Sequence, residues 1–293
     1  MTQGNQFAAR VRRWLGLVFL AYALRSVVAL TLAWPLAHRL APVNILALPR
    51  GDRELFAPGS RALIQTLAEQ APRLMKWWHW GWLWGSAVVF AGGVSAAFLL
   101  HALAQPPGTE VTVWLRKFRN ALPAVLAVTI IQWLAFLGLI TLGKTALPIV
   151  PAFVYPLFGE KGADAALLVL ALAVAALAFL VFVIADLARA AAVAWPDGMQ
   201  ASLGLALQSF ASRPQLCVAV AMGYFTASCV LPVGAEWLLP KTLTASSLGL
   251  ATTVLIHQLV VAALCALHLF WWHTTLRVVC APQQTKNNPL TLR

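Results

Sequence analysis

The feature that most constrains this chain is a series of apolar runs, each long enough to cross a lipid bilayer as a helix. The longest unbroken run, residues 165–185, contains no charged side chain and no proline. A hydrocarbon core about 30 Å thick requires about 20 apolar residues of helix. Because backbone groups in lipid must satisfy their hydrogen bonds internally, helices are the expected form of such runs. The sequence therefore predicts an all-α fold.

Composition excludes an ordinary soluble domain. Of the 293 residues, 61% are hydrophobic and 10% are charged, whereas soluble domains have about 25% charged residues. We expect a polytopic transmembrane helix bundle of about six spans, with amphipathic interfacial helices. Residues 1–280 would form a single bundle domain and residues 281–293 a polar C-terminal tail. The expected spans are residues 14–37, 80–104, 122–142, 165–188, 216–239 and 246–272.

The distribution of basic residues predicts the topology. The net charge is +12, and cations gather in cytoplasmic loops of membrane proteins. With the N-terminus inside, the short outer loops contain only Lys144, Lys161 and Lys241, whereas the inner segments contain most of the arginines. Both termini are therefore expected in the cytoplasm. The chain has no long Lys/Arg-rich arm, so we expect no nucleic-acid partner.

Residues 111–120 are a candidate membrane-surface segment. Arg116, Lys117 and Arg119 lie among apolar and aromatic residues that include Trp114 and Phe118. A basic segment of this kind suits an anionic leaflet. The expected partners are therefore the lipid bilayer with its anionic headgroups, and a protein partner or a second copy of the chain.

Two further segments suggest interfacial structure. Residues 60–75 predict a helix that is either re-entrant or lies on the outer surface. Five of the 13 tryptophans follow closely, and indole rings favour the headgroup boundary; a cage for a cationic ligand is the alternative. These tryptophans are Trp77, Trp78, Trp80, Trp82 and Trp84.

The end of the fourth span combines opposite charges with a turn. Asp186 and Arg189 are one helical turn apart, so they can pair on one face; we expect an ion pair at the membrane interface. A turn at residues 195–198 follows, in which Asp197 can cap the next helix. That helix has apolar residues at a spacing that fits a position on the membrane surface. They are Met199, Leu203, Leu207 and Phe210.

Ionisable residues inside the expected spans are the candidate functional residues, because a charge in hydrocarbon is costly. Each of them also has a purely structural interpretation, as a hydrogen-bonded core residue or an interfacial ion pair. The candidate polar pocket consists of Arg25, His101, Asp186, Arg189 and His257.

Part of the chain resembles a known group. Residues 186–197 and a following helix that ends at Arg213 and Pro214, together with residues 55–59, resemble uncharacterised bacterial six-span membrane proteins. Some of these are similar to the membrane domain found with glycerophosphodiester phosphodiesterases. The resemblance implies a six-helix bundle in a bacterial inner membrane. It transfers no catalytic residues, because the phosphodiesterase domain is not in this sequence.

Enzymatic signals are weak. The carboxylates are scattered along the sequence, and no span contains a close pair of them that could perform general acid–base catalysis. Residues 138–145 match the P-loop spelling but lack the required strand before and helix after it. The four cysteines form no C-x-x-C pair, so we expect no metal, cofactor or catalytic residue.

Three functions are compatible with the sequence. The preferred hypothesis is transport or a transport-associated role, with helices around the polar pocket. The alternatives are a membrane scaffold or assembly partner that binds lipid or protein through basic inner helices, and, least favoured, an intramembrane lipid-modifying enzyme.

Overall fold

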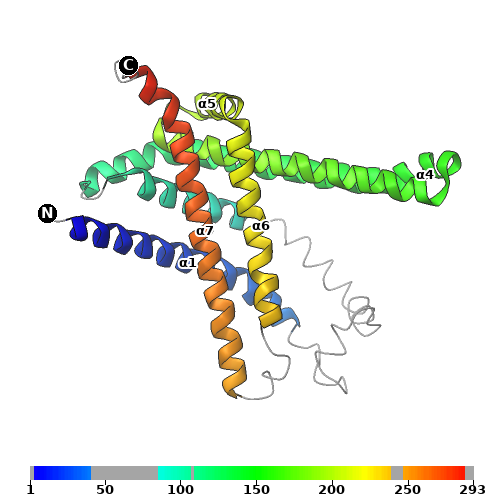
Figure 1. Cartoon of the computed structure of the whole chain (residues 1–293), viewed down its shortest axis with the longest axis horizontal. Coiled ribbons are helices and arrows are strands. Elements are labelled where there is room, and N and C mark those ends of the chain that lie inside the picture. The colour runs from blue at the N-terminus through cyan, green and yellow to red at the C-terminus, as the bar shows by residue number, and fades with distance from the viewer. Residues whose placement is uncertain (1–2, 41–84, 107–108, 239–246, 288–293) are drawn as a thin grey trace. The chain divides into compact units, whose positions relative to one another are not determined.

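The computed structural model describes residues 3–40, 85–106, 109–238 and 247–287, and the regular secondary structure in these ranges is α-helical. The all-α prediction is confirmed for this part of the chain. The predicted helix at 60–75 and the tryptophans at 77–84 lie outside the described residues. The helices are α1 (Gln3–Leu40), Gly85–Ala104, α4 (Val111–Ala194), α5 (Met199–Ser212), α6 (Pro214–Leu238) and α7 (Ser247–Asn287) (Figure 1).

Five of these helices are long and apolar enough to cross a membrane. Only the short α5 is not among them, and it has 14 residues. The chain is therefore a multi-pass helical membrane protein. α7 continues to Asn287, so the first seven residues of the expected C-terminal tail are helical.

The chain divides into two compact units. The first comprises Met1–Tyr22 and Gly93–Arg293, and the second comprises Ala23–Gly92. In the second unit, the described part of α1 exposes apolar side chains such as Val27 and Leu30. The first unit contains most of the described helices and most of the buried residues.

α4 is a helical hairpin that turns at Gly159. The expected third span ends at residue 142, and Pro148, Pro151 and Pro156 are expected in the outer loop that follows, which also contains Lys144 and Lys161. Instead the helix includes these prolines and is interrupted at Gly159, where φ is 69° and ψ is −169°. Proline removes one N–H donor without preventing helical φ, and apolar surroundings favour internal backbone hydrogen bonds. Only glycine adopts the dihedrals of Gly159 without strain, so the turn falls there.

The core of the first unit lies at the base of this hairpin. The buried residues of α4 fall mainly at 121–129 on the first arm and 183–193 on the second. Residues 185–193 are all buried, and most of them are alanine, which lets neighbouring helices approach closely. Between these stretches both arms expose apolar side chains, for example Phe153 and Leu172.

α5 packs mainly on α4 through small residues rather than through its large apolar ones. Its buried residues are Ser202, Ala206 and Ser209, whereas Leu207 is 52% exposed. The helix is preceded by Gly198 as its N-cap, without a side-chain capping hydrogen bond. The expectation that Asp197 caps this helix is therefore wrong, because the chain places a glycine at the capping position.

Candidate functional site

The only charged side chains in the described core are Asp186 and Arg189, on the second arm of α4. Nη1 of Arg189 lies 2.5 Å from Oδ1 of Asp186. The predicted pairing within one turn is present. The two residues are only 1% and 7% exposed, so the pair lies inside the helix bundle rather than at the protein's surface.

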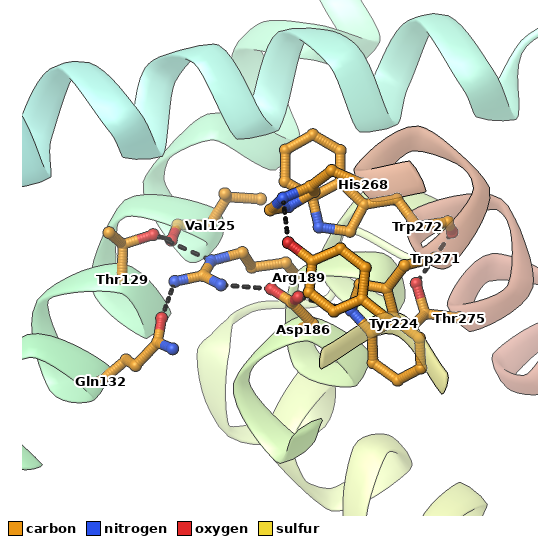
Figure 2. Close-up of polar contacts among 10 residues, drawn as sticks. All are labelled: Val125, Thr129, Gln132, Asp186, Arg189, Tyr224, His268, Trp271, Trp272 and Thr275. Carbon is orange, nitrogen blue, oxygen red and sulfur yellow. Dashed lines mark hydrogen bonds and ion pairs between the residues drawn. The ribbon is translucent and has the colours of Figure 1, made fainter. Parts of the chain in front are cut away.

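The Arg189 guanidinium is held from the other arm of the hairpin. Its Nε donates to Oγ1 of Thr129 at 3.1 Å, and its Nη2 donates to Oε1 of Gln132. Thr129 in turn donates to the carbonyl oxygen of Val125 at 2.8 Å. All three guanidinium nitrogens therefore have an acceptor, and the two arms of α4 are joined at this point (Figure 2).

The Asp186 carboxylate is held from α7. Nε1 of Trp271 donates to its Oδ2 at 2.7 Å, and the Trp271 side chain is almost completely buried. Both carboxylate oxygens thus accept a hydrogen bond from a donor in a different residue. Figure 2 shows Asp186 between the guanidinium and the indole.

An aromatic cluster surrounds Trp271 and connects α4, α6 and α7. The Trp271 ring is stacked with Phe182 and Tyr224, with centroids 6.1 and 6.2 Å apart. The Tyr224 hydroxyl also lies 2.9 Å from Nδ1 of His268. The buried charges therefore have aromatic residues around them, which exclude water from the carboxylate side.

The contacts of Asp186 and Arg189 determine which role this ion pair can have. A buried charge is costly unless it is paired and hydrogen-bonded, and a buried ion pair is favourable only when further hydrogen bonds satisfy it. Asp186 and Arg189 meet that requirement entirely with protein groups. We call Asp186, Arg189, Thr129, Gln132 and Trp271 the polar clasp, because their contacts join the two arms of α4 and α7.

The two histidines of the expected pocket have partners outside the clasp. His101 is buried in the first unit, with Nε2 3.2 Å from the carbonyl oxygen of Trp114 and its ring against that indole. His257 is exposed on α7, with Nδ1 2.8 Å from the carbonyl oxygen of Thr253. Arg25 belongs to the second unit, where its side chain is exposed.

Sequence reasoning missed three of the five members of the polar clasp. Thr129, Gln132 and Trp271 are separated from their partners by 57 to 85 residues. One signal was present, because Thr129 and Gln132 are polar residues inside an apolar run, three positions apart, and so share a helical face.

Within the described ranges, no group of three or more His, Cys, Asp or Glu side chains is arranged to hold a metal ion. The polar clasp contains one carboxylate and no histidine or cysteine. Its chemistry is that of a charge-assisted hydrogen-bond network.

Fold and clasp together define the class: a multi-pass helical membrane protein with a buried ion pair at the base of a long hairpin. Comparison of the chain with protein-family models, curated proteins and solved structures gives no match.

Proposed function

We propose that this protein is a membrane scaffold, a rigid helical unit on which other membrane components assemble. The observation that carries the proposal is the saturation of the Asp186–Arg189 pair by protein donors and acceptors. A transport pathway needs polar groups that face a solvated cavity. Here the most polar groups of the core bind each other and hold helices together.

The same proposal includes six membrane crossings, with α4 crossing twice. Thr129 and Arg189 lie equally far, 30 residues, from Gly159. At 1.5 Å per residue this places the clasp about 45 Å from the turn, which is close to the full thickness of a bilayer with its headgroups. The turn then lies on the outer side and the clasp near the inner boundary, with both termini cytoplasmic in a bacterial inner membrane.

The exposed apolar arms of α4 support the assembly role. Leu147, Phe153, Leu168 and Leu172 are each more than half exposed. Apolar side chains in this position face lipid or the helices of a neighbouring protein. Because the clasp fixes the base of the hairpin, the arms present this surface in one orientation.

Cysteine accessibility in intact cells and inverted vesicles tests the proposal. After replacement of the native cysteines, single cysteines would be placed at Val128 and Ala190, which lie beside clasp residues and are buried, and at the exposed Asp197 and Arg213 as positive controls. A scaffold predicts that a small polar thiol reagent labels the controls and not the buried positions. Labelling at 128 or 190 that a solute suppresses would instead establish a wet pathway.

Transport remains the second candidate because of one observation. Gln132 is only partly buried, so the clasp has one member at the edge of the core. If water reaches Arg189 through Gln132, a cysteine at 132 would react with the polar reagent and a cysteine at Val128 would not. Protection of position 132 by a transported solute would favour transport over the scaffold.

A further inference from the structure

Three helices of the first unit, α1, α4 and α7, bring basic residues close to the end of the Gly85–Ala104 helix. Arg13 of α1 donates to the carbonyl oxygens of Ala102, at 2.6 Å, and Gln105, at the end of the Gly85–Ala104 helix. The Gln105 side chain also lies 3.5 Å from Nζ of Lys117, near the start of α4. Carbonyl groups at a helix C-terminus carry partial negative charge, so a guanidinium is a favourable partner there.

The C-terminal part of α7 reaches the same place. The rings of Trp14 and His273 meet edge to face, with centroids 5.6 Å apart. Both Arg13 and Arg277 are close enough to act electrostatically on the His273 ring. The N-terminal parts of α1 and α4, the end of the Gly85–Ala104 helix and the C-terminal part of α7 are therefore neighbours.

The cations gathered here have no anionic partners in the described part of the protein. Arg13 uses its guanidinium on backbone carbonyl groups, and the other basic side chains are exposed and form no ion pair with a described residue. The Glu110 carboxylate, at the start of α4, accepts a hydrogen bond from Thr112 at 2.5 Å. The basic patch is defined as Arg12, Arg116, Lys117, Arg119 and Arg277.

The patch borders exposed apolar residues. Val111 and Leu115 are 69% and 52% exposed, and Arg119 follows Leu115 by one helical turn on the same face. Trp114 and Phe118 are turned inward and stack on each other at 5.4 Å. The start of α4 thus exposes a mixed apolar and basic face, the pattern of a helix at a membrane surface.

We propose that the basic patch binds the phosphate groups of anionic phospholipid headgroups. Two observations favour lipid over nucleic acid. The patch adjoins exposed apolar side chains that suit an acyl boundary, and it lies at the ends of helices long enough to span a bilayer. The inference rests on the proposed membrane placement of this end, but not on the scaffold role.

Native mass spectrometry of the full-length protein in detergent tests the inference, with phosphatidylglycerol and phosphatidylcholine as lipid probes. The wild type should retain phosphatidylglycerol selectively, and less of it as the salt concentration rises. Arg116→Gln/Arg119→Gln should lower the affinity roughly 30-fold, since each cation near an anionic surface contributes about a fivefold effect.

The matched control is Lys144→Gln/Lys161→Gln, which removes the same charge from exposed positions on the α4 arms. This control should bind phosphatidylglycerol like the wild type. Circular dichroism and gel filtration would check that each variant is folded, and Arg277→Gln provides a second variant on another helix, with an expected loss of about fivefold.

Three results would overturn the inference. The first is equal loss of lipid in the patch and control variants, which would indicate a response to net charge alone. The second is displacement of the lipid by inorganic phosphate at millimolar concentration, which would indicate a site for small anions. The third is retention of a short oligonucleotide in preference to the lipid, which would indicate a nucleic-acid surface.

Discussion

The indole Nε1 of Trp271 donates a 2.7 Å hydrogen bond to Oδ2 of Asp186, a residue 85 positions earlier in the chain. The other oxygen of that carboxylate binds Arg189. The buried side chain of Trp271 therefore connects α7 to the base of the α4 hairpin. Substitutions at and around this contact test the structure most directly.

Trp271→Phe should destabilise the protein because it removes the indole donor while keeping most of the aromatic surface. A hydrogen bond to a charged group contributes about 1.5–3 kcal/mol, and we expect a loss of that size in the free energy of unfolding in mixed micelles. Trp272→Phe is the matched control, since Nε1 of Trp272 has no hydrogen-bond partner among the described residues. Equal losses in the two variants would show that the Asp186 contact contributes nothing.

Gly93→Val should destabilise the protein by overpacking. A Cβ atom at Gly93 would lie 3.0 Å from Cδ2 of Leu126 and 3.2 Å from Oγ1 of Thr129, which accepts the Nε–H of Arg189. Overpacking in a dense core costs about 1–3 kcal/mol.

The control for this change is Gly138→Val, because a Cβ atom there meets nothing within 4 Å. The same valine is introduced into a helix in both cases, so the difference in thermal midpoint reports the packing at Thr129. A Gly93 variant as stable as the Gly138 variant would contradict the close approach.

Gly159→Ala should destabilise the α4 hairpin. Its dihedrals, φ 69° and ψ −169°, lie in a region that is essentially restricted to glycine. The expected cost is about 1–3 kcal/mol, measured by unfolding in mixed micelles, and limited proteolysis should cleave the variant faster near the turn. Gly143→Ala, at a position on the first arm where a Cβ meets nothing within 4 Å, should be neutral or slightly stabilising. A Gly159 variant with unchanged stability would argue against a tight turn at this residue.

The helical class of the protein was predictable from sequence, and so was the Asp186–Arg189 pair, because both depend on local spacing. The register of the hairpin was not. Residues equally far from Gly159 lie opposite each other, so residues 122–142 lie opposite residues 176–196. The expected spans 122–142 and 165–188 therefore lie side by side over only part of their length. No local sequence pattern could indicate this offset.

The missed members of the clasp have the same explanation. Thr129 and Gln132 are polar residues on one face of an apolar run, and only the hairpin shows that their partner is Arg189. The spacing of His257 and His268 places them on the same face of α7. His257 is nevertheless exposed, whereas Nδ1 of His268 lies 2.9 Å from the hydroxyl oxygen of Tyr224 on α6. Periodicity identifies a face of a helix, whereas the partner of that face depends on packing between distant segments.

The central claim is that Asp186 and Arg189 stabilise the helix bundle as a coupled, sealed pair, and a double-mutant cycle tests it most directly. Removing one partner of a buried pair leaves an uncompensated charge, so Asp186→Asn and Arg189→Met should each cost about 3–5 kcal/mol of unfolding free energy. The double variant has no buried charge left, and we predict that it is more stable than either single variant. Losses that simply add, or single variants close to the wild type, would show that the two residues are not coupled and would contradict the clasp.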